Sequence, residues 1–192
     1  MDNIWILLLK SAYFLVPAYF ANMAPPLIKK FGILESLAKP VDKGEKWHDD
    51  REVFGANKTY RGFIVGMIGG AIGGLLQLLL YDVSIFHSLS ISGIMYDNML
   101  FMVCFGALMG FGAILGDLIE SFFKRRIGVA PGKSFRPWDQ IDLVFGAYLF
   151  ILPVVYSFIS WKLFLCSVFV TFFLHVLTNH AAYYLHIRKE KW

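Results

Sequence analysis

The sequence G-F-I-V-G-M-I-G-G-A-I-G-G, residues 62–74, decides the fold class of this chain. It holds no charged residue and lies mostly within an apolar run, residues 63–81, of the length that a membrane-spanning helix needs, about 20 residues. Glycine stands at every fourth position, at Gly62, Gly66, Gly70 and Gly74. Small residues at this spacing let two helix backbones approach closely in a bilayer, where no hydrophobic effect drives association. The pattern therefore predicts a transmembrane helix packed tightly against a neighbour, with a flexible hinge as the alternative.

Four further apolar runs predict an all-α integral membrane protein with about five transmembrane helices. The 192-residue chain is 57% hydrophobic and its mean hydropathy is +0.59, whereas soluble domains average about 45–50% apolar residues. Little soluble mass remains, so we expect a single membrane-embedded domain over residues 1–192. Asp2 stands where a signal peptide needs basic residues, so the first run is expected to be retained, and Pro17 is expected to kink it. The expected spans are residues 4–23, 63–81, 99–118, 143–159 and 163–187.

Basic residues are distributed unevenly among the connecting segments. Residues 29–61 contain eight Lys and Arg, residues 120–142 contain five and the C-terminal tail contains three, out of 18 in the chain. Because cytoplasmic loops of membrane proteins carry the excess of Lys and Arg, we expect the N-terminus outside, the C-terminus in the cytoplasm and two polar cytoplasmic loops, at about residues 25–62 and 119–142. The same asymmetry explains the net charge of +4 without a nucleic-acid partner.

The second polar loop brings cations together with two carboxylates. Asp139 and Asp142 are three residues apart, so on a helix they would project together at the rim of the membrane. Acids in a first helical turn also complement the helix dipole, which would explain one of them. Two acids beside several cations fit a Mg²⁺ site better, because Mg²⁺ takes one or two carboxylates and completes its shell with water and substrate phosphate. The cations are Lys124, Arg125, Arg126, Lys133 and Arg136.

The end of the third span adds further candidates. If that helix continues past the membrane surface, Asp117, Ser121 and Lys124 lie on one face. Asp117 stands at the edge of an apolar run, where an acid is costly and usually functional. The alternative is an internal pair, Asp117 with Ser121 or Glu120 with Lys124, worth only about 0.3–0.5 kcal/mol.

The first polar loop ends in F-G-A-N-K-T-Y-R-G, residues 54–62, which mixes hydrogen-bonding and cationic side chains. Lys58 and Arg61 could be simple positive-inside anchors, but that would not explain Asn57 and Thr59 between and beside them. The rest of this loop is nearly charge-balanced, and we expect it to be mostly solvated.

The segment G-V-A-P-G-K-S, residues 128–134, resembles a phosphate-binding P-loop but does not match it. The Walker A pattern needs four residues between its glycine and the G-K pair, and this segment has three. Lys133 can still act as a point charge on a phosphate.

Four segments together resemble the CDP-archaeol synthase family, which is related to the CDP-diacylglycerol synthases. They are P-V-D-K-G (residues 40–44), F-G-A-N-K-T-Y-R-G (54–62), the G-D pair of the third span (116–117) and K-S-F-R-P-W-D-Q-I-D (133–142). The likeness covers nearly the whole chain. The chain lacks the H-G-G of the CDP-diacylglycerol synthase signature and has Gln140 where that signature has Arg. It therefore fits the archaeol-type branch better and leaves the acceptor lipid open.

The resemblance implies a CTP-dependent cytidylyltransferase of phospholipid biosynthesis. It would convert a membrane lipid phosphate, archaetidic acid-like or phosphatidic acid, to a CDP-lipid and pyrophosphate, with Mg²⁺ as cofactor. Its partners would be CTP, the lipid phosphate and the bilayer, its site would face the cytoplasm in a multi-pass protein of the cell membrane, and a homodimer stays open. The implied catalytic residues are Asp117, Lys124, Asp139 and Asp142, with the three acids at the metal. The implied nucleotide-site residues are Asn57, Lys58, Thr59 and Arg61, and Ser121 and Arg125 would join the same polar cavity. The cations Lys124, Arg125, Lys133 and Arg136 would bind either the leaving pyrophosphate or the lipid phosphate.

Two other classes of protein share the hydropathy pattern. A CDP-alcohol phosphotransferase is also a lipid-phosphate enzyme, but its D-G-x-x-A-R motif is absent from this sequence. A non-enzymatic transporter subunit would be expected to place polar residues near the bilayer midplane, whereas here they lie at the rim.

Overall fold

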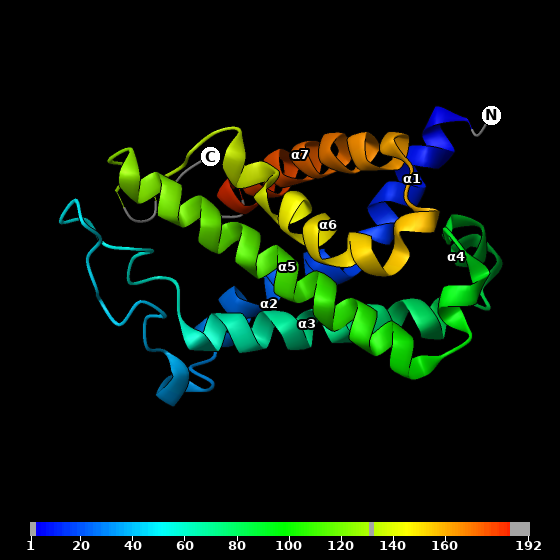
Figure 1. Ribbon diagram of the computed structural model, residues 1–192. Helices are drawn as coiled ribbons and strands as arrows, with labels where there is room; N and C mark the ends of the chain where they lie inside the picture. The colour runs from blue at the N-terminus through cyan, green and yellow to red at the C-terminus, as the bar shows by residue number, and fades with distance from the viewer. Residues whose placement is uncertain (1–2, 131–132, 185–192) are drawn as a thin grey trace.

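Helix α5, Met99–Arg126, crosses the bundle between α3, Tyr60–Leu80, and α6, Asp142–Val155, in the computed structural model (Figure 1). The structure describes residues 3–130 and 133–184, and within them it has helices and two isolated β-bridges but no strand. The other α-helices are α1 (Ile4–Phe14), α2 (Val16–Lys30), α4 (Ser84–Leu89) and α7 (Trp161–Tyr184), and the short 3-10 helices are η1 (Glu35–Leu37), η2 (Gly93–Tyr96), η3 (Trp138–Gln140) and η4 (Tyr156–Phe158).

Three helices of the described residues are long and apolar enough to cross a membrane: α3, α5 and, within α7, Trp161–His180. Helices α1 and α2 make a fourth span if they count as one broken helix, bent by 46°. Helix α6 has 14 residues, about 21 Å, which is shorter than a hydrocarbon core of about 30 Å. The prediction of an all-helical multi-pass protein is thus confirmed, whereas the five spans, the orientation and the single domain stay predictions.

The break in the first apolar run lies at Leu15, between α1 and α2. Pro17 follows in the first turn of α2, where the missing N–H of proline is not needed by the helix. The expected kink near Pro17 is confirmed. The last residues of the expected fifth span and the basic tail, which includes Arg188, lie outside the described residues.

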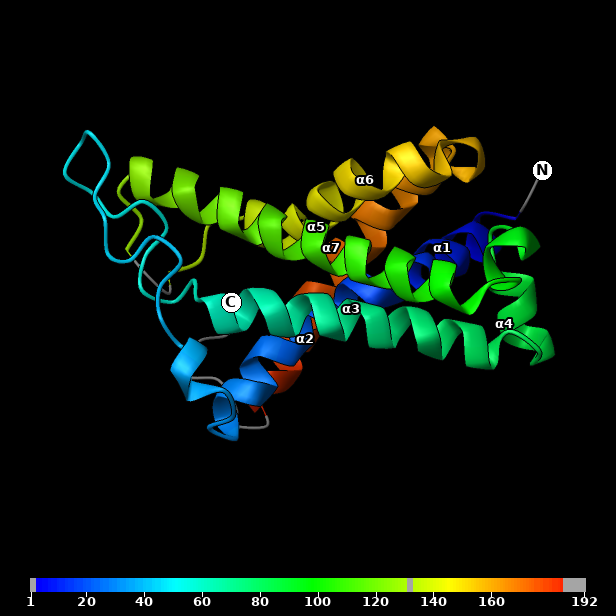
Figure 2. The ribbon, with the colours of Figure 1, turned by 60° about the horizontal axis from the view of Figure 1, so that its bottom comes forward.

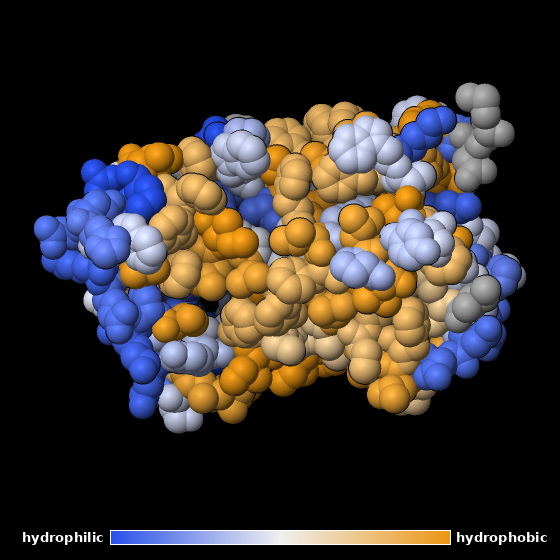
Figure 3. All heavy atoms as spheres, viewed as in Figure 1, coloured by the Kyte–Doolittle hydropathy of each residue, from blue (hydrophilic) through white to orange (hydrophobic). Residues whose placement is uncertain are grey.

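The two long polar loops lie at one end of the bundle. In Figures 1 and 2 the segment between α2 and α3 and the segment between α5 and α6 both lie at the end of the bundle where α3 begins and α5 ends, and α1 begins at the opposite end. Hydrophilic residues gather at this loop end, and apolar side chains form a broad band across the middle of the molecule (Figure 3). At 28 residues, α5 is about 42 Å long and exceeds the apolar core of a bilayer, so one of its ends must project into the polar region.

Glycines allow α5 to pack against two neighbours at backbone contact. A Cβ added to Gly70 would lie 2.3 Å from the backbone O of Gly106, and one added to Gly146 would lie 2.1 Å from that of Gly112. No real Cβ tolerates such a distance, so these positions require glycine. The predicted close packing is confirmed for Gly66, Gly70 and Gly74 of α3, but not for Gly62, whose added Cβ would make only an ordinary contact, 3.5 Å from Thr59 Oγ1.

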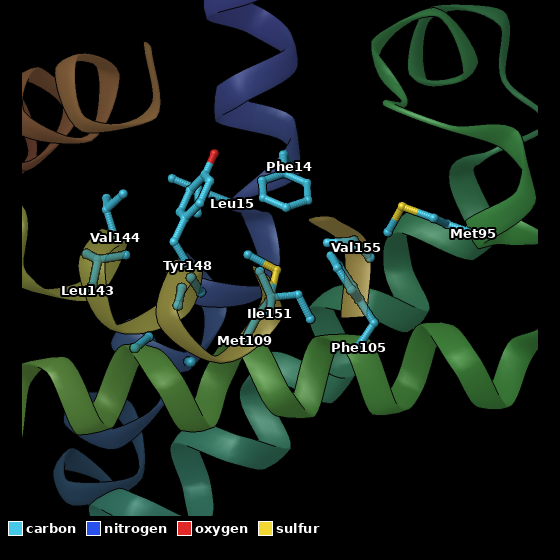
Figure 4. Packing of buried hydrophobic residues seen from close by; sticks show 14 of the residues in the cluster. Phe14, Leu15, Met95, Phe105, Met109, Leu143, Val144, Tyr148, Ile151 and Val155 are labelled. Atoms are coloured by element: carbon cyan, nitrogen blue, oxygen red, sulfur yellow. The ribbon is translucent and has the colours of Figure 1, made fainter. Parts of the chain in front are cut away.

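The apolar core lies between α1, α5 and α6 (Figure 4). Leu15, Met109 and Ile151 are fully buried there, and Phe14 packs against Phe105 with ring centroids 5.8 Å apart. Buried residues from Leu143 to Val155 pack α6 in this core beside α5. The loop end of that helix pair carries the charged residues described next.

Candidate active site

Three carboxylates meet where α5 and α6 cross. Asp117 and Glu120 come from the last turns of α5, and Asp142 is the first residue of α6; one carboxylate oxygen of each lies within 4.8 Å of the others. The two helices cross at backbone contact here, which the lack of a side chain at Gly116 allows: a Cβ on Gly116 would lie 2.3 Å from the backbone O of Asp142. We call Asp117, Glu120 and Asp142 the carboxylate trio.

Two lysines flank the carboxylate trio. Lys58, from the first polar loop, places Nζ 2.6 Å from each carboxylate oxygen of Asp117. Lys124, on α5, donates to Asp139 Oδ1 at 2.7 Å, and its Nζ lies 3.4 Å from Glu120 Oε1. Both polar loops therefore contribute charged groups to one site.

Asp139 lies beside the carboxylate trio, in the 3-10 helix η3. Its Oδ2 accepts the backbone N–H of Phe135 at 2.6 Å, while its Oδ1 accepts from Lys124. Burial raises the pKa of this carboxyl, but hydrogen bonds with Glu120, Lys124 and the Phe135 N–H outweigh that effect, so its pKa lies below the usual value. Asp139 is thus ionised and already paired with a cation.

The carboxylate trio fits a hard divalent cation. Glu120 is 7% exposed, and its buried Oε1 makes no hydrogen bond within the described residues, although the ammonium of Lys124 lies 3.4 Å away. A buried carboxylate oxygen without a hydrogen bond is costly, and a bound cation would satisfy it. Oxygen-only donor sets of this kind suit Mg²⁺, Ca²⁺ or Mn²⁺. The acidic cluster can therefore hold a metal ion.

Several of the predicted nucleotide-binding residues have contacts within the fold. Thr59 caps α3, since its Oγ1 accepts the N–H of Gly62 at 3.2 Å. Arg61 is buried and donates from Nη1 to the backbone O of Ile33 at 3.2 Å. These contacts give Thr59 and Arg61 structural roles, and their binding of nucleotide stays a prediction.

The other predicted residues divide by exposure. Ser121 and Arg125 are buried on α5, and two buried nitrogens of Arg125, Nε and Nη1, have no hydrogen-bond partner among the described residues. Asn57, Lys133 and Arg136 are exposed on the two polar loops. Two residues of the segment 128–134, which resembles a P-loop, lie outside the described residues: 131 and 132.

Asp42 is a site-supporting residue for which the sequence suggested no role. Its carboxylate accepts three backbone N–H groups, from Gly44 at 3.0 Å, Phe54 at 2.9 Å and Gly55 at 3.0 Å. The preceding residue, Val41, donates its N–H to the backbone O of Lys58 at 2.8 Å. Asp42 therefore closes the loop that presents Lys58 to Asp117.

Asp42→Asn is expected to destabilise the protein at neutral pH by about 1–2 kcal/mol, because an amide cannot accept all three N–H groups. Burial raises the pKa of Asp42, but the three N–H donors outweigh it and hold the pKa below the usual value. A carboxylate with a lowered folded pKa stabilises the fold above its unfolded pKa of about 3.9, and this stability is lost as the pH falls through the folded pKa. In thermal unfolding at pH 7 the variant should be less stable than the wild type, and this difference in stability should shrink below about pH 4. The exposed Asp82→Asn is the control, and a gap independent of pH would contradict the role of the charge.

The fold and the site together define a multi-pass helical membrane protein with a carboxylate-and-lysine site at one polar end. A family model described as CarS-like: CDP-archaeol synthase matches residues 4–192. The CDP-archaeol synthase of Methanocaldococcus jannaschii is 36% identical over 189 residues, covering 97% of this chain and 98% of that protein. The CDP-archaeol synthase of Methanococcoides burtonii is 34% identical over 185 residues, covering 93% and 100%.

The chain therefore belongs to the CDP-archaeol synthase family. It is an enzyme of the nucleotidyltransferase type, and it forms a CDP-lipid from CTP in membrane lipid biosynthesis. The resemblance seen in the sequence is confirmed, and so is the prediction of an enzyme. A solved structure described as "Structural insight into an intramembrane enzyme for archaeal membrane lipids biosynthesis" has a TM-score of 0.68 and 24% identity, over 87% of this chain and 90% of that chain, which supports the fold.

Proposed function

We propose that this protein transfers the cytidylyl group of CTP to a membrane lipid phosphate and releases pyrophosphate. The observation that carries the proposal is the carboxylate trio with two lysines, at the polar end of an apolar helical bundle. A triphosphate and a lipid phosphate are both anionic, so a shared site needs positive charge to bring them together. A lipid phosphate reaches such a site from the bilayer, and CTP reaches it from water.

In the proposed reaction an oxygen of the lipid phosphate attacks the α-phosphorus of CTP. The bond from that phosphorus to the oxygen bridging the α- and β-phosphates breaks, and pyrophosphate leaves with the electron pair. The attacking phosphate is already ionised, so no general base is needed. Catalysis then rests on positioning and on neutralisation of charge, as in other phosphoryl-type transfers.

The chain's own residues have distinct proposed roles. Asp117, Glu120 and Asp142 would hold a divalent cation, expected to be Mg²⁺, which supplies positive charge to the phosphates. Lys58 and Lys124 flank the carboxylate trio and would offer positive charge to the triphosphate or to the lipid phosphate. Asp139, predicted as a further ligand, is proposed instead to orient Lys124. Asn57, Ser121, Arg125, Lys133 and Arg136 remain candidates for contacts with CTP, beside Thr59 and Arg61.

The active site is proposed to face the cytoplasm. Both polar loops lie at the end of the bundle that carries the site (Figures 1 and 3), and they contain most of the basic residues of the chain. The positive-inside rule assigns such loops to the cytoplasmic side, where CTP is available.

The proposal is tested with purified full-length protein in detergent, labelled CTP, Mg²⁺ and either archaetidic acid or diacyl phosphatidic acid. We expect labelled CDP-lipid and an equal amount of pyrophosphate with one of the two acceptors, and no product when EDTA removes the metal. The ratio of the two rates identifies the acceptor class. Absence of product with both acceptors and with close isoprenoid and acyl variants would refute the proposal.

A further inference from the structure

The first polar loop and the C-terminal end of α5 hold each other through two arginines. Arg51 donates from Nη1 to the backbone O of Arg125 at 3.1 Å and to that of Arg126. In return, Arg126 donates from Nη2 to the backbone O of Arg51 at 3.3 Å and to that of Glu52, and from Nη1 to Asp49 Oδ1 at 2.9 Å. Each guanidinium thus binds the backbone of the segment that carries the other. We call Arg51 and Arg126 with these contacts the arginine clasp.

Aromatic contacts reinforce the arginine clasp. Trp47, on the same loop, packs edge-on against Phe122 of α5, with ring centroids 5.4 Å apart at 88°. The guanidinium of Arg126 lies 4.9 Å from the centroid of the same Phe122 ring. The backbone N–H of Trp47 donates to the O of Arg51 at 2.8 Å, which keeps the loop tip tight. The loop is therefore docked on α5 by packing as well as by charge.

The geometry of the clasp follows from the chemistry of a helix end. The last backbone carbonyls of a helix have no partner within it, and the helix dipole favours a cation there. Each arginine reaches its two carbonyls through one terminal nitrogen, Nη1 of Arg51 and Nη2 of Arg126. The planar guanidinium holds these N–H groups in fixed directions, which a rotating lysine ammonium does not. A solvated ion pair would be worth about 0–1 kcal/mol, but here most of the contacts go to backbone atoms that cannot rotate away.

We propose that Arg51 is a positioning residue of the active site, acting through the arginine clasp; this inference rests on the proposed function. The clasped end of α5 carries Glu120 and Lys124, and the clasped loop leads, through the turn closed by Asp42, to Lys58. The clasp therefore fixes the lysine of the loop relative to the carboxylate and the lysine of the helix. Its loss leaves the helices in place and loosens the spacing of the two lysines about the carboxylate trio.

Arg51→Gln tests the proposal in the full-length protein. We expect turnover to fall about tenfold, which is the lower range seen when a group that orients metal ligands is removed, and the half-saturating Mg²⁺ concentration to rise several-fold. Arg126→Gln should have the same effect, and the double variant should be no worse than either single variant, because both belong to one unit. Lys46→Gln is the matched control, since it removes the same charge from the same loop outside the clasp.

Two further measurements do not depend on turnover. Amide hydrogen exchange over residues 120–126 should speed up in Arg51→Gln and stay unchanged in Lys46→Gln, and Mn²⁺ should bind the Arg51→Gln protein several-fold more weakly. A lower thermal midpoint with unchanged metal affinity would indicate a merely structural role and overturn the proposal. Faster turnover in Arg51→Gln would overturn it too, because the loop would then act as a lid. If the wild type makes no CDP-lipid, the proposed function fails, while hydrogen exchange and Mn²⁺ binding still decide whether the clasp positions the site.

Discussion

Asp142→Asn is expected to lower CDP-lipid formation at least about 100-fold, because removal of a metal ligand should cost more than removal of a group that only orients one. Asp142 is the sole member of the carboxylate trio on α6, so without its charge the cation loses the ligand that links the two helices. The substitution is structurally mild, since Asp142 Oδ1 accepts the N–H of Leu143 at 2.7 Å and the oxygen of an asparagine can do the same. Initial rates at a series of Mg²⁺ concentrations measure both the loss and the shift in metal dependence.

Two companion variants separate the possible ligand sets. Glu120→Gln should lower turnover about as much as Asp142→Asn and shift its Mg²⁺ dependence in the same direction. Asp139→Asn should have a smaller effect, with Mg²⁺ dependence close to that of the wild type, because Asp139 is paired with Lys124. If Asp139→Asn is as severe as Asp142→Asn while Glu120→Gln is nearly neutral, the metal is held by the acids that the sequence indicated. Unchanged turnover and Mg²⁺ dependence in Asp142→Asn would rule out this site altogether.

The difference between the two ligand sets has a simple physical origin. The spacing of Asp139 and Asp142 suggested that they project together from one helix. In the structure Asp139 lies in η3 and α6 begins only at Asp142, after Ile141 with φ −127°, so the two acids do not share a helix face. Glu120, which local spacing pairs with Lys124, joins Asp142 through the crossing of α5 and α6. That crossing is a tertiary contact, and no local pattern contains it.

The elements that the sequence predicted well are those with local causes. The uncharged apolar runs predicted helices, because backbone N–H and C=O groups inside a bilayer must hydrogen-bond to one another. Glycines four residues apart indicated close contacts between helices. The first polar loop shows the limit of this reasoning. Its side chains from Lys43 to Arg51 are exposed, as expected for a solvated segment, yet Arg51 binds backbone carbonyls of α5. Backbone carbonyls are present at every residue, so composition gives no signal for such a contact.

Gly146→Leu is expected to abolish turnover and to destabilise the protein by about 3 kcal/mol or more, at the upper end of overpacking effects. A Cβ at this position would lie 2.1 Å from the backbone O of Gly112 and 2.8 Å from the N of Gly116. These are backbone atoms in the middle of a helix, so no side-chain rotation can relieve the clash, and α6 must move away from α5. Such a movement carries Asp142 away from Asp117 and opens the carboxylate trio.

Gly62→Ala is the matched control, since its Cβ would meet Thr59 Oγ1 at an ordinary 3.5 Å, and alanine favours a helix over glycine by about 1 kcal/mol. Thermal unfolding, Mn²⁺ binding and CDP-lipid formation are measured for both variants. A Gly146→Leu protein with wild-type stability and wild-type metal affinity would mean that the crossing of α5 and α6 does not bring the acids together.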